Sequence, residues 1–180
     1  MDFQKIRQYA IDCHNRSNCE YDGQPYNTHT DMVVHLVQRF YYIFQFQEDR
    51  DNTEGAGHCH DLMEDAKESY NDIKNNTNKD IADIVLAVTD VHEANRLLRH
   101  LFTMGKTVKD HRAIILKMCD MYANASYSKA HGSSMYAKYV EEYSYRKPIF
   151  KKALTWYKKY INFDVLDLFW TELDEVHNVK

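Results

Sequence analysis

The sequence predicts an all-α protein that forms a single domain. The chain has 180 residues, a length that suits one compact domain. Apolar residues recur mostly at helical spacing, and no segment of useful length alternates between polar and apolar residues. Its 5 Gly and 2 Pro are too few for the tight turns of a β-sandwich or barrel, whereas 14 Tyr, 8 Phe and 2 Trp can build a core.

Three helical stripes are predicted in the first half of the chain. The first stripe runs from Phe3 to Cys13, and the second runs from Val33 to Phe44, with Thr28 or Thr30 as its expected cap. The third covers 81–88 and is opened by Asn78. Composition predicts breaks between helices at 22–25, 54–57 and 75–78.

The second half of the chain also has helical periodicity. One apolar stripe covers 97–102, and a longer helix is predicted over about 108–126. Further helices are expected over 134–145, after Pro148 and over 163–176. We therefore expect one domain over 1–180, with the functional motifs in a core of about 10–130 and additional C-terminal helices over 131–180.

Charge and cysteine usage narrow the class of protein. A formal net charge of -4 argues against nonspecific nucleic-acid binding, so no nucleic-acid partner is expected. The four cysteines form no CxxC pair, which favours reduced thiols over a structural zinc site. Neither a secretory signal nor an apolar run of roughly 20 residues is visible. We therefore expect a cytoplasmic protein with no membrane partner.

Histidines and carboxylates occur in an unusual order along the chain. His29 opens the second stripe, His60 and Asp61 are adjacent in what we expect to be a helix, and Asp120 lies in an otherwise apolar segment. A carboxylate there is costly to bury unless it is paired or bound to a metal. Two imidazoles and two carboxylates suit Mn, Fe, Co, Ni or Zn, with positions left for water and a substrate oxygen.

A second acidic pair follows the His-Asp dipeptide by one helical turn. Glu64 comes four residues after His60, and Asp65 comes four after Asp61. Carboxylates at that distance from a metal can polarise its water or move a proton. Taken singly, His29 also suits a cap, Glu64 and Asp65 suit a solvated face, and Asp120 suits an ion pair with Lys117. The joint order of these residues favours a metal site.

Four segments resemble motifs of one enzyme family. Residues 22–29 are similar to SGEPYxxHP, 60–65 to HDxxED, 84–90 to LVxxVTx, and 110–124 to DxRxxxIKLADRxxN. Together they cover about 13–127. The ordered set resembles the HD superfamily of metal-dependent phosphohydrolases, and within it the hydrolase domain of RelA/SpoT proteins and the small Mesh-like alarmone hydrolases.

The resemblance implies an HD-domain helical bundle and a stand-alone (p)ppGpp 3′-pyrophosphohydrolase without synthetase activity. It implies a nucleotide substrate and Mn²⁺ as cofactor, with another divalent transition metal as the alternative. Whether the protein forms a homo-oligomer is left open. The roles it implies are metal binding for His29, His60, Asp61 and Asp120, activation of water for the catalytic pair Glu64 and Asp65, and substrate binding for Asn124 and Lys117. Tyr21 is a further candidate for substrate binding, on the chemistry of its ring alone.

The sequence departs from this family in its expected substrate pocket. Glu20 and Tyr21 replace an Arg-Lys pair that the family uses against base and phosphates, although Tyr21 can still stack on a base. Met121 replaces an Arg, and residues after about 128 match no motif; their Tyr and Lys residues are expected to form core and solvated face. Two alternatives therefore stay open. One is an HD phosphatase on another nucleotide such as NADPH or a nucleoside monophosphate, and the other is a non-catalytic nucleotide-binding sensor.

Overall fold

Helices dominate the structure, which confirms the all-α prediction. A computed structural model of the chain describes residues 1–179. The helices of the first half and the hairpin between them are α1 (Phe3–Arg16), β1 (Glu20–Tyr21), β2 (Gln24–Pro25), α2 (Asn27–Arg39), α3 (Gln47–Cys59), α4 (Tyr70–Asn76) and α5 (Lys79–Val88). The second half contains α6 (Arg96–Thr107), α7 (His111–Ala130), α8 (Met135–Leu154) and α9 (Phe163–Val176). Two short 3₁₀ turns follow α2 and α8, at Tyr41–Ile43 and Thr155–Tyr157.

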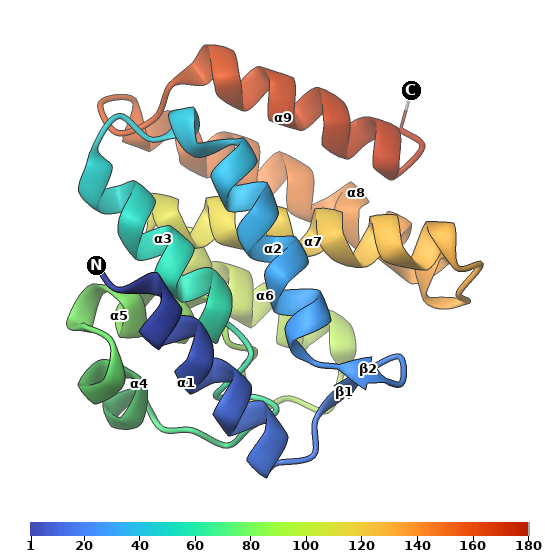
Figure 1. Ribbon diagram of the computed structural model, residues 1–180. Helices are drawn as coiled ribbons and strands as arrows, with labels where there is room; N and C mark the ends of the chain where they lie inside the picture. The colour runs from blue at the N-terminus through green and yellow to red at the C-terminus, as the bar shows by residue number, and fades with distance from the viewer. Residues whose placement is uncertain (180) are drawn as a thin grey trace.

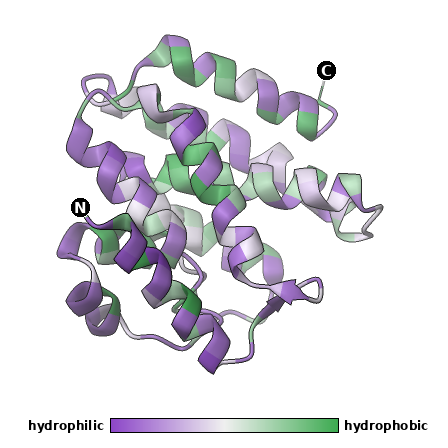
Figure 2. Ribbon diagram, in the orientation of Figure 1, coloured by the Kyte–Doolittle hydropathy of each residue, from purple (hydrophilic) through white to green (hydrophobic). Residues whose placement is uncertain are grey.

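The long helix α7 lies at the centre of the bundle (Figure 1). It packs against α2 and α3 on one side and against α8 on another, while α9 and α1 lie toward opposite ends of the molecule. Ile114, Leu116 and Met118 of α7 are completely buried. Hydrophobic residues gather at the centre of the bundle, and hydrophobic and hydrophilic residues alternate along the outer helices α1 and α9 (Figure 2). Burial of apolar surface along α7 therefore holds the two halves of the chain together.

The predicted break at 54–57 is wrong, because these residues lie inside α3. A Cβ atom at Gly57 would stand 2.9 Å from Cγ2 of Val34, and one at Gly55 would stand 2.5 Å from Cδ1 of Ile81. The two glycines therefore allow α3 to approach α2 and α5 closely. The break at 22–25 is confirmed as the β1–β2 hairpin, in which Asp22 and Gly23 have positive φ angles of 53° and 73°.

Several predicted helix boundaries are also wrong. Helix α2 begins without a side-chain cap and ends at Arg39, so Thr28 and Thr30 are not caps and the stripe does not continue as helix to Phe44. Helix α4 occupies part of a stretch for which no helix was predicted. Pro148 lies inside α8, so the two helices expected around it form one.

Helix α6 is present, but its buried face is the opposite of the predicted one. Leu97, Leu98, Leu101 and Phe102 are 50%, 43%, 41% and 58% exposed. The inward face consists of His100, Thr103, Met104 and Thr107. Polar contacts fix this orientation: His100 Nδ1 lies 2.8 Å from the Tyr145 hydroxyl, and the Thr107 hydroxyl donates to the Ala87 carbonyl. Within residues 1–179, no helix combines the length and apolar character needed to cross a membrane.

Candidate metal centre and its cavity

Three helices bring the predicted ligands together at one point. His29 lies in the first turn of α2, His60 directly follows α3, and Asp120 lies in the middle of α7. The His29 and His60 Nε2 atoms are 3.2 Å apart, and Asp120 Oδ1 is 3.3 Å from the former and 3.9 Å from the latter. Among residues 1–179, these three form the one cluster of His, Cys, Asp or Glu tight enough to hold a metal ion.

Asp61 joins this cluster from the side. Its Oδ2 atom lies 3.0 Å from His60 Nε2 and 3.5 Å from His29 Nε2. The expectation that the His-Asp dipeptide lies within a helix is wrong, because His60 is the C-terminal cap of α3 and Asp61 lies in the turn that follows. Leaving the helix at this point allows both side chains to face the same centre.

The donor set fits a divalent transition metal. Ligand atoms about 2.1 Å from one ion lie roughly 3.0 to 3.4 Å from their neighbours, close to most of the separations here. His60 Nδ1 lies 2.9 Å from the Gly57 carbonyl, and donating its proton there leaves Nε2 free as a ligand. His29 and His60 are each only 2% exposed, yet their Nε2 atoms face each other. A bound cation would account for this arrangement of two buried lone pairs.

Electrostatics in the cluster follow from its two carboxylates. Burial lowers the pKa of His60, but Asp61 and Asp120 outweigh burial and raise this pKa to about 9. Burial opposes ionisation of Asp120, yet Lys117 and the two histidines hold the pKa of this carboxyl well below its usual range. Lys117 Nζ lies 2.9 Å from Asp120 Oδ2. Asp120 therefore pairs with Lys117 through Oδ2 and joins the cluster through Oδ1.

Tyr26 links the ligand Asp61 to the acidic pair, a role that sequence reasoning missed. Its hydroxyl lies 2.8 Å from Asp61 Oδ2 and 2.5 Å from Asp65 Oδ2. The ring of Tyr26 stacks on His14, with centroids 4.2 Å apart. One phenol thus fixes the relative positions of two carboxylates. Tyr26 lies in the motif at 22–29, and this position was the one signal in the sequence for a role at the site.

Glu64 and Asp65 both line the cavity next to the cluster. The side chain of Glu64 reaches solvent, but partial burial of its carboxylate raises its pKa to about 7, against the opposing charge of Lys117. Glu64 Oε1 accepts a hydrogen bond of 2.7 Å from the Asp90 amide. Burial also raises the pKa of Asp65, and the hydrogen bond from Tyr26 opposes this shift. Both carboxyls are therefore disposed to take up a proton.

The cavity has a volume of about 280 Å³ and collects nearly all the predicted site residues. His60 lies outside its lining; the others in it are Tyr21, His29, Asp61, Glu64, Asp65, Lys117, Asp120 and Asn124. Asn124 donates to Asp120 Oδ1 at 2.6 Å and accepts from the Tyr21 hydroxyl at 3.1 Å. Tyr21 stacks on His29 at 4.8 Å, so one face of its ring is already covered.

The remaining cavity wall comes from α6 and α8, which sequence reasoning did not place at the site. The residues missed there are Arg96, His100, Tyr139, Glu142 and Arg146. Arg96 Nε lies 2.7 Å from Glu142 Oε1, and Arg146 Nη2 lies 3.4 Å from Glu142 Oε2. The expectation that the Tyr and Lys residues of this region form core and solvated face is therefore wrong for Tyr139, which lines the cavity. No motif marks them, because their position depends on how α8 packs against α7.

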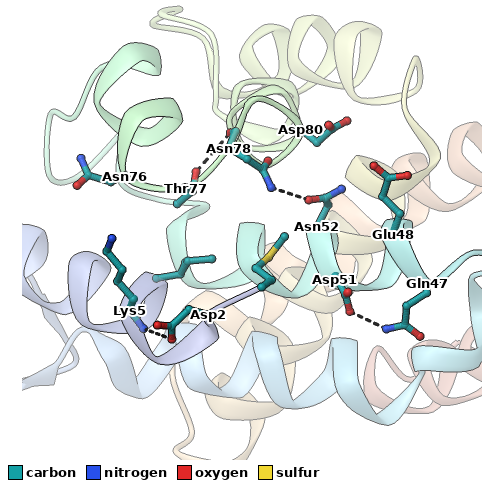
Figure 3. A pocket seen from close by; sticks show the side chains of 12 residues that line it. Asp2, Lys5, Gln47, Glu48, Asp51, Asn52, Asn76, Thr77, Asn78 and Asp80 are labelled. Carbon is teal, nitrogen blue, oxygen red and sulfur yellow. Dashed lines mark hydrogen bonds between the residues drawn. The ribbon is translucent and has the colours of Figure 1, made fainter.

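A larger hollow of about 740 Å³ lies elsewhere, between the start of α1, α3 and the α4–α5 connection (Figure 3). Asn78 donates to Asn52 across it, and Asp2, Glu48 and Asp80 line it. Figure 3 shows these side chains spread around an open depression. The metal-ligand cluster therefore distinguishes the smaller cavity as the candidate site.

Comparisons with known proteins support the same fold. No family profile matches the sequence, and no curated protein is significantly similar to it. Among solved structures, the chain is similar to a metazoan ortholog of SpoT that hydrolyses ppGpp and plays a role in starvation responses. The TM-score is 0.72 with 18% sequence identity, over 99% of this chain and 96% of that one. The resemblance to alarmone hydrolases is thus confirmed at the level of the fold.

Proposed function

We propose that this chain is a stand-alone, metal-dependent nucleotide phosphohydrolase that removes pyrophosphate from the 3′ position of (p)ppGpp. The observation that carries the proposal is the convergence of His29, His60, Asp61 and Asp120 at one point, next to a cavity that Glu64 and Asp65 line. The solved relative of the same fold hydrolyses ppGpp, which supports this substrate. The cavity also presents Lys117, Arg96 and Arg146, cations that suit a phosphorylated ligand.

The two imidazoles and two carboxylates would hold the metal, and we propose Mn²⁺ with other divalent transition metals as substitutes. When bound, such an ion supplies Lewis acidity and lowers the pKa of its water. The four free thiols at Cys13, Cys19, Cys59 and Cys119 support the further proposal of a reducing, cytoplasmic compartment.

The chain's own groups account for proton handling. Glu64 takes the proton of the attacking water as the water oxygen bonds to the phosphorus next to the 3′ oxygen. The bond from that phosphorus to the ribose oxygen breaks and pyrophosphate leaves. The ribose oxygen takes a proton from solvent water, and Glu64 returns its proton to solvent. Tyr26 holds Asp65 next to the reacting centre, and Lys117 offsets the negative charge around Asp120. Asn124, anchored to Asp120 and Tyr21, faces the ribose-phosphate region.

A second candidate is a phosphatase of the same fold that acts on another nucleotide. The presence of Glu20 and Tyr21 where alarmone hydrolases have an Arg-Lys pair favours it, because two cations expected against the base and phosphates of the alarmone are missing. The sensor alternative is less favoured, because a protein that only binds nucleotides does not need Glu64 and Asp65 in the cavity.

Hydrolysis of a nucleotide panel with Mn²⁺ tests these candidates. We expect release of pyrophosphate from ppGpp and pppGpp at a higher kcat/KM than phosphate release from NADPH or nucleoside monophosphates. The double variant Glu64→Gln/Asp65→Asn should bind ligand and lose at least about 100-fold in turnover. Preference for NADPH or a monophosphate would favour the second candidate. Binding without turnover of any compound would favour the sensor.

A further inference from the structure

A second, small cavity of about 20 Å³ lies between α7, α8 and the end of α9, and two buried side chains on its wall lack partners. Arg146 of α8 and His177, the C-terminal cap of α9, are 7% and 1% exposed. The Arg146 Nε and His177 Nε2 atoms are buried and have no hydrogen-bond partner among residues 1–179. Unpaired buried polar atoms destabilise a fold, so two of them on one small cavity need an explanation.

The two unpaired atoms are chemically complementary. His177 Nδ1 lies 2.7 Å from the Leu173 carbonyl, which can only accept, so Nδ1 carries a proton. Burial lowers the pKa of His177, and the nearby charge of Arg146 acts in the same direction, so the ring is neutral near pH 7. His177 Nε2 therefore presents a lone pair, whereas Arg146 Nε can only donate a hydrogen bond. One atom needs a donor and the other needs an acceptor.

Neighbouring contacts hold both side chains in place. The His177 ring stacks on Tyr143, with centroids 4.1 Å apart and an angle of 12° between the planes. The Tyr143 hydroxyl donates to Asp174 Oδ1 at 2.6 Å, which fixes the end of α9 on α8. Arg146 Nη2 lies 3.4 Å from Glu142 Oε2. Neither side chain can turn to another partner without losing one of these contacts, so the missing partner must enter the cavity between them.

We propose that one ordered water molecule binds in this cavity, where it accepts a hydrogen bond from Arg146 Nε and donates one to His177 Nε2. A cavity of about 20 Å³ has room for a single water. A buried water makes about three hydrogen bonds on average, and the second hydrogen of this one can reach an oxygen of Asn124 or Glu142, which line the same cavity. The water satisfies both unpaired atoms at once.

The water makes His177 a positioning residue for the candidate site. Arg146 lines the main cavity as well as the small one, so a water that fixes its Nε atom also fixes the guanidinium that faces the candidate site. His177 lies outside the lining of the main cavity and acts through the water and Arg146. The consequence for turnover rests on the proposed function, whereas the water site does not.

A high-resolution crystal structure of the full chain and NMR of the Arg146 Nε proton test the water directly. The crystal should show one water within hydrogen-bond distance of both atoms. In His177→Asn, whose shorter amide keeps a donor for Leu173 but does not reach the cavity, the Nε proton should exchange with solvent at least about tenfold faster. His177→Gln places an amide oxygen near the position of Nε2 and should keep the slow exchange.

His131→Asn is the matched control. His131 caps α7 in the same way, with Nδ1 2.8 Å from the Tyr127 carbonyl and its ring stacked on Tyr127, but it is exposed. This variant should leave the exchange of the Arg146 Nε proton unchanged. A dry cavity in the wild-type crystal would overturn the proposal, and so would equal exchange rates in the wild type and His177→Asn.

Kinetics then test the positioning role. If the wild type hydrolyses a nucleotide, His177→Asn should raise KM several-fold and leave kcat and bound metal nearly unchanged, because the water orients Arg146 and not the reacting atoms. His177→Gln should restore the wild-type KM. Equal losses in both variants would show that His177 is only structural. Absence of hydrolysis would count against the proposed function, while the crystal and the NMR comparison would still decide whether the water is present.

Discussion

At the scale of single residues, the two histidines of the cluster should be required for metal binding, whereas a nearby histidine outside the cluster should not. His29→Ala or His60→Ala should reduce bound transition metal from about one ion per chain to a small fraction, because each removes a buried ligand. Elemental analysis of protein purified without chelators measures this. His35→Ala is the control, since His35 lies on the same helix α2 with an exposed side chain. Full metal occupancy in both ligand variants would refute the metal centre.

The pH dependence of turnover should report on Glu64. Partial burial raises its pKa to about 7. A carboxyl that acts as a base works only when ionised, so kcat should rise as the pH increases through this range. A bound divalent cation favours the carboxylate and moves the rise to lower pH. Glu64→Gln should remove the rising limb as well as most of the activity. A wild-type profile with no rising limb anywhere on the acidic side of its optimum would exclude this role.

Sequence reasoning identified the cluster better than the cavity wall that α6 and α8 form. His29 and His60 lie in recognisable motifs, and Asp120 lies in an apolar segment where a carboxylate is unusual. Their order along the chain was therefore informative. Arg96 and Arg146 gave no such signal. An arginine on a helix is ordinary, and only the packing of α6 and α8 around α7 turns these two toward the cavity.

At the scale of helices, the close contact of α3 with α2 depends on Gly57. We expect Gly57→Ala to lower the free energy of unfolding by about 1 to 2 kcal/mol, because its Cβ would stand 2.9 Å from the Val34 side chain. Gly105→Ala is the matched control, because no atom lies within 4 Å of its added Cβ. This control should gain about 0.5 to 1 kcal/mol from helix propensity. Chemical denaturation of the two variants measures both effects, and equal stabilisation of both would contradict the close packing.

Helix positions were predicted best where apolar spacing and a capping residue agreed. Asn78 does cap α5, its side chain accepting from the Ile81 amide. Helix α3 was missed because its buried residues are mostly small or polar, including Asn52, Thr53 and Glu54, and because Gly55 and Gly57 resemble a turn. Pro148 predicts a helix break, but α8 continues through it, with Phe150 and Leu154 completely buried beyond it.

At the scale of the whole molecule, the motif-bearing core and the C-terminal helices should unfold together. Helix α7 packs against α2 and α8, and Phe40 of the first half stacks on Phe169 of α9 at 4.2 Å. We therefore expect one thermal transition for the full chain, with the same midpoint by far-UV and near-UV circular dichroism. A chain ending at residue 130 should fail to show this cooperative transition, because it exposes the surface that α8 and α9 cover. Two separate transitions would contradict the single-domain prediction.

The inverted orientation of α6 has a consequence for the order in which parts of the protein open. Its leucines contribute little to its attachment, since they face solvent and only Met104 of its large apolar side chains is buried. Amide hydrogens of α6 should therefore exchange with deuterium much faster than those of α7, through local opening that leaves the rest folded. Arg96 and His100 would leave the cavity wall in each such event. A nucleotide that contacts Arg96 should slow exchange in α6 selectively, so ligand binding would be visible in a helix distant in sequence from every metal ligand.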